Sequence, residues 1–175
     1  MKITDITLTP LKTGKNLLRV QTDAGVEGWA EAAGRNVFGA YLEASIKPAL
    51  VGENPLDIGR HWDTLALGKG ERFYKLPGAV VGTIDVALWD LLGKETGLPV
   101  YQLMGGVTRT EIPLYWSTGS GWKMQPDDML DLVKVGWDAG YRSFKIRMDW
   151  RGWRQDIDPE KDFQMFKLVR EFLEP

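Results

Sequence analysis

The sequence contains no cysteine and only one histidine, His61. Without cysteine the chain can form no disulfide, and it offers no thiolate that could bind a metal or attack a substrate. A single histidine also excludes a metal site built from several histidines of this chain. These two absences remove several common kinds of catalytic and structural centre.

The chain also lacks a strong excess of either charge and lacks a long apolar run. Its 22 basic and 24 acidic residues leave a net charge of −2, so neither nucleic acid nor a charged membrane surface is expected as a partner. No apolar stretch approaches the ~20 residues that span a bilayer, and the N-terminus shows no signal-peptide pattern. We therefore expect a cytoplasmic protein with no nucleic-acid and no membrane partner.

What is present is a globular composition, with 43% hydrophobic and 26% charged residues among 175. The first part of the chain predicts an α+β domain that begins with a three-stranded antiparallel meander. Its strands are expected at residues 3–8, 17–21 and 26–32, with Gly25 supplying the positive φ of a tight hairpin. Helical patterns follow at residues 37–50, 55–67 and 80–92, the last with one broad apolar face that Gly97 and Pro99 terminate.

The pattern changes after Gly106. A strand is expected at residues 111–118, a helix at 126–140, a strand at 141–148, and a last helix with Asp158 as its N-cap. The two helices should bury Met129, Leu132, Val133 and Trp137, and Met165, Phe166, Val169, Phe172 and Leu173. The order strand, helix, strand, helix with short connections is typical of a parallel α/β sheet or barrel.

The segment S-F-K-I-R-M-D-W, residues 143–150, alternates apolar and charged side chains. Because neighbouring side chains of a strand point to opposite faces, one face should carry Phe144, Ile146 and Met148, and the other Lys145, Arg147 and Asp149. The two cations would lie ~6.5 Å apart along the strand. Such a face is either exposed to solvent or an arrangement of charges that serves a function.

Three segments resemble one enzyme family. The run I-D-V-A-L-W-D-L-L-G-K-E-T-G-L-P-V-Y-Q-L-M-G-G, residues 84–106, resembles the end of the N-terminal capping domain in the mandelate racemase/muconate lactonizing branch of the enolase superfamily. G-V-E-G-W-A-E-A, residues 25–32, resembles that domain's hairpin, and F-K-I-R, residues 144–147, resembles the family's second barrel strand. The resemblance implies an α+β capping domain at residues 1–107 and the first two βα units of a TIM-type (β/α) barrel at residues 108–175.

The resemblance also implies a chemistry. Enzymes of this family hold Mg²⁺ on three carboxylates from the third, fourth and fifth barrel strands, and they abstract a proton α to a substrate carboxylate. These strands are not in the present sequence, so no metal ligand is expected among its residues. The expected partner is a small carboxylate or acid-sugar substrate, and the expected assembly is a homo-oligomer.

Lys145 and Arg147 are the candidate catalytic residues, because alternate side chains of a barrel strand point inward and catalytic groups gather at the strands' C-terminal ends. The family's second strand usually carries Lys-x-Lys with the second lysine as base, but Arg147 occupies that position and arginine hardly deprotonates. We expect Arg147 to anchor or polarise a substrate oxygen. A neighbouring cation disfavours the protonated form of a lysine and so lowers its pKa. Lys145 would therefore be either an electrostatic partner of Arg147 in the site or a less usual base. A His–Asp pair on later strands is the alternative base.

Substrate contacts are predicted from two cap loops, which the resemblance implies close over the substrate. One loop contains Lys12, and the other contains Arg72 and Phe73. For each of these residues a solvated surface loop is an equally good interpretation.

The turn after the first barrel strand supplies two further candidates. Ser117 could bind a substrate oxygen, and Trp116 could form a pocket wall or simply belong to the barrel core. His61 and Trp62 could reach the same site, but a lone histidine on a helix is more often structural.

The sequence therefore predicts the N-terminal part of a Mg²⁺-dependent acid-sugar (aldonate or aldarate) dehydratase. A racemase or a cycloisomerase of the same superfamily is the alternative. Because a TIM barrel needs eight βα units and this chain supplies two, the chain alone should be inactive. A non-catalytic fragment that at most dimerises or complements a partner chain is the third hypothesis. Its second barrel strand would leave an unpaired edge, which favours association.

Overall fold

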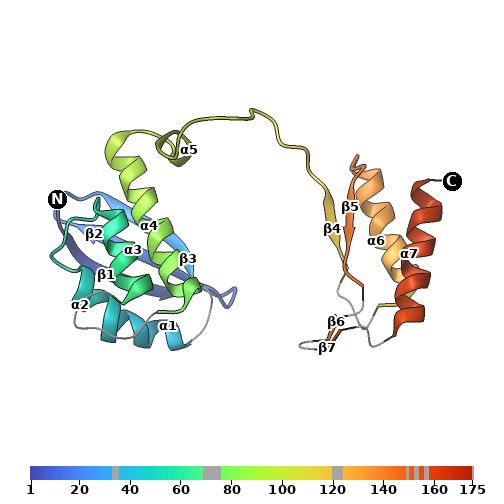
Figure 1. The fold of residues 1–175 in the computed structure, drawn as a ribbon, viewed down its shortest axis with the longest axis horizontal. Coiled ribbons are helices and arrows are strands. Elements are labelled where there is room, and N and C mark those ends of the chain that lie inside the picture. Colours follow the sequence, from blue (N-terminus) through green and yellow to red (C-terminus); the bar gives the residue numbers. More distant parts are fainter. Residues whose placement is uncertain are drawn as a thin grey trace. The chain divides into compact units, whose positions relative to one another are not determined.

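The computed structural model describes residues 1–32, 36–68, 76–119, 124–148, 150–151, 154–155 and 158–174. The chain forms two compact units, unit 1 (Met1–Thr108) and unit 2 (Arg109–Pro175) (Figure 1). Each unit has its own hydrophobic core. None of the helices that the structure describes has both the length and the apolar character needed to cross a membrane.

Unit 1 begins with the predicted three-stranded antiparallel sheet. Its strands lie in the order β1 (Ile3–Pro10), β2 (Asn16–Thr22) and β3 (Glu27–Ala32). Gly25 adopts a φ of 79° in the turn between β2 and β3, as predicted. An irregularity between Ile3 and Asp5 shifts the register of β1, and this shift allows both Ile3 and Ile6 to be buried.

The first helical segment of unit 1 is a continuous run that changes its pitch. It consists of α1 (Asn36–Tyr41), the π-helix η1 (Leu42–Ile46) and α2 (Lys47–Leu50), which confirms the helix predicted at residues 37–50. In the wider turn the Lys47 N–H donates to the Leu42 carbonyl. Pro48 follows directly, and a proline has no N–H and crowds the carbonyl four residues earlier. A π-turn at this point accommodates the proline without ending the helix.

The next helix starts later than the sequence predicts. We expected it to begin at Pro55, but α3 spans Ile58–Leu67. The Asn54 side-chain oxygen accepts the Leu56 N–H at 3.2 Å, and the Asn54 carbonyl accepts the Asp57 N–H at 3.2 Å. An asparagine that bonds the backbone two residues on forms a local turn, and this turn replaces the first helical turn.

The last of the three helices predicted in unit 1 packs across the sheet. α4 (Gly78–Thr96) lies beside β3 in Figure 1, and the short α5 (Val100–Leu103) follows it. Gly97, in a left-handed conformation with φ 69°, ends α4 as predicted. The apolar face predicted within residues 80–92 is confirmed: α4 buries Val80, Val81, Ile84, Ala87, Leu88 and Leu91, and Leu92 is partly buried beside them.

Unit 2 confirms the predicted order of strand, helix, strand and helix. Its main elements are β4 (Trp116–Thr118), α6 (Pro126–Asp138), β5 (Phe144–Ile146) and α7 (Pro159–Leu173). β4 and β5 are parallel, with Trp116, Ser117 and Thr118 opposite Phe144, Lys145 and Ile146. A two-residue antiparallel ladder, β6 (Trp150–Arg151) and β7 (Arg154–Gln155), was not predicted.

Both parallel strands are shorter than predicted, because residues 111–115, 141–143 and 147–148 join no ladder in the described part of the chain. The core of unit 2 consists of Met124, Met129, Val133, Met165 and Val169. Two predicted core residues are wrong, since Leu132 and Phe166 are 37% and 52% exposed. Asp158 is the predicted N-cap, and its carboxylate accepts the Lys161 N–H at 3.1 Å.

Candidate functional site

The carboxyl ends of β4 and β5 bring three polar side chains to one face of the sheet. Ser117 lies directly opposite Lys145 in the parallel ladder, so their side chains are neighbours on the same face. Both residues are exposed, whereas Phe144, Ile146 and Met148 pack against the core of unit 2. The predicted alternation of a charged and an apolar face is therefore confirmed for residues 144–148, and Asp149 lies outside the described residues.

Arg147 continues the charged face one step beyond the ladder. Its backbone N–H donates to the Thr118 carbonyl at 3.0 Å, which holds the end of β5 against the end of β4. The Arg147 side chain is exposed and shares a face with Lys145 because side chains repeat every two residues. One hydroxyl and two cations thus line the strand ends. This set of groups suits the binding of an anionic group such as a carboxylate.

Gly119 permits this close approach, and the sequence prediction missed its role. It adopts a φ of 101°, a conformation that L side chains rarely take. A Cβ at this position would lie 2.7 Å from the Arg147 carbonyl oxygen and 2.7 Å from the Met129 Cε. The two strand ends can therefore meet only around a glycine. Its place directly after a strand in a barrel-like pattern was the available signal.

Trp116 lies on the opposite side of β4 from Ser117. Its Nε1–H donates to the Leu132 carbonyl of α6 at 3.1 Å, and its ring stacks at a tilt on Tyr141 with centroids 5.2 Å apart. Gly136 leaves the space for the indole, since a Cβ there would lie 2.5 Å from the ring. Of the two interpretations of Trp116, pocket wall or barrel core, this position fits the core. The ring packs between β4 and α6, on the face opposite to Ser117.

The predicted cap-loop residues belong to unit 1. Lys12 is exposed in a tight turn, where the Leu11 N–H donates to the Lys15 carbonyl at 2.8 Å and Gly14 has a φ of 79°. Arg72 and Phe73 lie outside the described residues. A role for these three residues in substrate binding remains a prediction.

His61 has a structural role. It is 3% exposed, and its Nε2 lies 2.7 Å from the Asn54 carbonyl, so Nε2 carries the proton and donates it. This bond ties α3 to the turn that precedes it.

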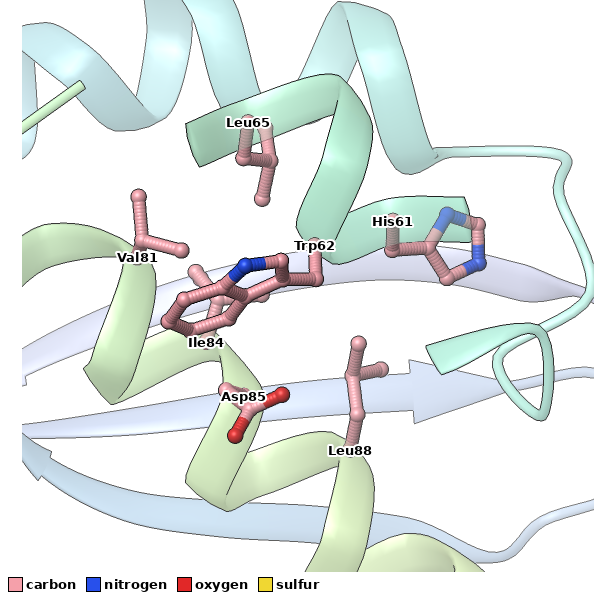
Figure 2. Close-up of a pocket in the computed structure, with 7 residues that line it drawn as sticks. All are labelled: His61, Trp62, Leu65, Val81, Ile84, Asp85 and Leu88. Atoms are coloured by element: carbon pink, nitrogen blue, oxygen red, sulfur yellow. The ribbon is translucent and has the colours of Figure 1, made fainter. Parts of the chain in front are cut away.

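The pocket beside His61 is too small to receive a substrate. It has a volume of about 10 Å³, barely one water molecule, and lies between α3 and α4 (Figure 2). In Figure 2 Trp62 extends from α3 toward α4, where Asp85 and Leu88 line the pocket. Partial burial raises the pKa of the Asp85 carboxyl above its ordinary value.

The strand ends do not fit a metal ion. Mg²⁺ prefers carboxylate and carbonyl oxygens, whereas the groups gathered here are a hydroxyl and two cations. Within the described ranges, no three side chains of His, Cys, Asp or Glu gather so that they could hold a metal ion. A hydroxyl and two cations are groups that can bind an anion.

Residues 7–105, more than half of the chain, match the N-terminal domain of mandelate racemase / muconate lactonizing enzyme. D-galactonate dehydratase from Verminephrobacter eiseniae is 33% identical over 150 residues, which are 83% of this chain and 38% of that protein. A D-galactonate dehydratase family member from Streptomyces bingchenggensis is 36% identical over 139 residues, 77% of this chain and 33% of that protein.

Comparison with solved structures indicates the same family. A mandelate racemase/muconate lactonizing protein from Paracoccus denitrificans has a TM-score of 0.83 and 29% identity, and the match covers 99% of this chain and 49% of that one. D-glucarate dehydratase from Agrobacterium tumefaciens, complexed with magnesium, has a TM-score of 0.76 and 27% identity over 100% of this chain and 52% of that one. The chain thus spans about half the length of its solved relatives. It belongs to the mandelate racemase/muconate lactonizing enzyme family of the enolase superfamily.

Proposed function

We propose that this chain is the N-terminal part of an acid-sugar dehydratase. The observation that carries the proposal is the match to D-galactonate dehydratase over 150 residues, 83% of this chain, which is longer than the 108 residues of unit 1 and so extends into unit 2. Residues 1–107 would be the capping domain and residues 108–175 the start of the barrel. The whole protein would be a cytoplasmic homo-oligomer.

The proposed reaction removes the proton α to the substrate carboxylate and the hydroxyl on the neighbouring carbon. Together these groups leave as water, and the enol that remains becomes a 2-keto-3-deoxy acid. Arg147 would bind a carboxylate or hydroxyl oxygen of the substrate, because guanidinium donors match carboxylate geometry. Lys145 would stabilise the negative charge that develops after proton removal, or accept the proton itself. Ser117 would donate a hydrogen bond to a substrate oxygen.

The proposal includes dependence on Mg²⁺, since a relative with this fold was solved with magnesium. The ligands would have to come from residues beyond those that the structure describes. A racemase or cycloisomerase is the second candidate, because the matching family unites both activities in its description. The two candidates differ in their product, which is either a keto acid or an isomer of the substrate.

The first experiment is the intact mass of the natural protein, followed by a Mg²⁺-dependent screen of aldonates and aldarates. A mass near 19.7 kDa would mean that the polypeptide consists of these 175 residues, and would favour the non-catalytic fragment. A larger protein that releases 2-keto-3-deoxy acid from an acid sugar would support the dehydratase. A larger protein that only exchanges or inverts the α-proton would support the racemase.

Variants of the active form test the assigned roles. Arg147→Ala should lower kcat/KM by 10²-fold or more, on the order of 3 kcal/mol of transition-state stabilisation. Arg147→Lys restores the usual Lys-x-Lys pattern and should gain exchange of the α-proton. Lys134→Ala, which removes a partly exposed cation paired with Asp131 on α6, is the matched control and should keep full activity. Full activity in Arg147→Ala would refute the role of Arg147.

A further inference from the structure

One of the two outer strands of the unit 1 sheet, β3, has an edge that side chains of α4 cover. β3 pairs with β2 and, within the described part of the chain, with no other strand. An open strand edge presents unpaired N–H and C=O groups and can add a strand from another molecule. On β3 the outward backbone groups belong to alternate residues, Glu27, Trp29 and Glu31.

Two residues of α4 bond these outward groups. The Asp90 carboxylate accepts the Trp29 N–H at 2.8 Å, and the Lys94 ammonium donates to the Glu27 carbonyl at 3.0 Å. Lys94 also donates to the same Asp90 oxygen at 2.6 Å, so the pair is held together one helical turn apart. A carboxylate and an ammonium thus occupy the acceptor and donor positions that a neighbouring strand would use.

Gly28 allows α4 to come close enough for these bonds. A Cβ at Gly28 would collide with the Ala87 carbonyl oxygen and would lie 2.9 Å from the Leu91 Cβ. With glycine at this position the helix backbone lies directly on β3, and the short Asp90 side chain reaches the edge. Asp90 and Lys94 are one turn apart and so lie on the same side of the helix.

We infer that Asp90 and Lys94 form an edge cap that prevents β3 from pairing with β3 of a second copy of this chain. The partner is a second copy because antiparallel pairing centred on Trp29 would satisfy the same backbone groups in both molecules. The flanking charges are already neutralised within each copy, since Glu27 pairs with Arg19 and Glu31 with Lys15. These two carboxylates would therefore oppose the pairing less than unpaired carboxylates would.

The test removes the cap from the 175-residue chain and measures its mass by sedimentation equilibrium. Asp90→Ala/Lys94→Ala should raise the mass to at least twice that of the parent chain, because every copy then exposes one uncapped β3 edge. Lys167→Ala/Glu171→Ala removes an ion pair of the same i, i+4 type on α7 and should leave the parent mass unchanged.

A third change identifies the surface. Adding Glu31→Pro to the cap-less variant should restore the parent mass, because proline on an edge strand has no N–H to offer a second copy. An unchanged mass in Asp90→Ala/Lys94→Ala, or a doubled mass that Glu31→Pro does not reverse, would overturn the inference.

A second measurement uses the parent chain and does not depend on the folding of a variant. The Trp29 amide proton should exchange with solvent at least 10-fold more slowly than the Glu31 amide proton. Both point outward from β3, but only the Trp29 N–H has an acceptor among the described residues. Equal exchange rates would mean that Asp90 does not cap the edge in solution.

Discussion

The two units differ in how far each completes its own core. Among the described residues, the main core of unit 1 contains 19 buried residues and that of unit 2 contains five. The outer edges of the unit 1 sheet are also bonded: β3 by Asp90 and Lys94, and β1 at Ile3, which exchanges backbone bonds of 2.9 and 2.8 Å with Glu53 and Gly52. Unit 1 therefore has the features of a domain that folds by itself.

The sequence of unit 2 predicts its helices and strands well, but few layers of structure pack over the apolar side chains of these elements. Among the residues that the structure describes, its parallel sheet has two strands joined over three residue pairs, and a two-stranded sheet is marginal by itself. Apolar side chains stay exposed on the segment before β4, on α6 and on α7, as shown by Leu114 (69%), Val135 (55%) and Phe163 (58%). Helix caps and strand alternation define local structure, whereas stability depends on how much apolar surface is buried between packed layers of helices and strands. We expect unit 2 to be the less stable unit.

The largest expected effect is a loss of stability in unit 1, which would remove its advantage over unit 2. Gly28→Ala places a methyl group against the α4 backbone, which cannot move aside as a flexible side chain can. We expect a loss of about 3 kcal/mol or more in the free energy of unfolding of unit 1. Urea denaturation followed by hydrogen exchange, read separately for the two units, measures the change.

Gly59→Ala is the control for that experiment. Gly59 lies in α3 with open space around it, so alanine should stabilise unit 1 by about 0.5–1 kcal/mol. If Gly28→Ala left unit 1 as stable as the parent, the close packing of β3 on α4 would be wrong. Loss of protection in unit 2 alongside unit 1 would show that the two units unfold together.

A smaller effect concerns the strand ends of unit 2. Gly119→Ala combines a strained positive φ with contacts to the Arg147 carbonyl and to Met129, and should cost about 2–3 kcal/mol. Gly140→Ala has a similar φ, 94°, but open space, and should cost only about 1–2 kcal/mol. The difference between the two variants, measured by thermal unfolding of unit 2, isolates the close approach of β4 and β5. Equal losses would contradict that approach.

The smallest expected effect is a pH dependence within unit 1. Burial raises the pKa of Asp85 above its ordinary value of 3.8 in the folded state, so the folded state holds the proton more tightly than the unfolded state. Stability should therefore fall as the pH rises from 3.8 through the folded-state pKa, and the charged carboxylate then destabilises unit 1. Asp85→Asn should stabilise unit 1 at pH 7 by at most about 0.5 kcal/mol, and this gain should vanish below pH 3.8.

Denaturation curves at pH 7 and pH 3 measure this difference. Glu95→Gln, an exposed carboxylate on the same helix, gives the baseline for replacing a carboxylate by an amide. A gain from Asp85→Asn that is the same at both pH values would show that packing, and not the charge, is responsible.

Much of the fold could be predicted because the signals are local. The Gly25 turn, the Gly97 terminus and the Asp158 cap each depend on the conformational preference of one residue, and all three are confirmed. The late start of α3 was missed because Asn54 competes for backbone bonds, and such competition is hard to weigh from a sequence. Leu132 and Phe166 were predicted as buried from periodicity, which identifies an apolar stripe but not its partner.

The candidate site divides in the same way. The sequence by itself determined the alternation of Lys145 and Arg147 with apolar neighbours, because the two-residue period of a strand is a property of the backbone. Only the tertiary structure decided that Ser117 stands beside Lys145, that Trp116 turns to α6, and that Gly119 lets the strand ends meet. It also decided that Asp90 reaches the edge of β3, 61 residues away in the chain. Register and close approach between distant segments depend on packing, and no local preference encodes them.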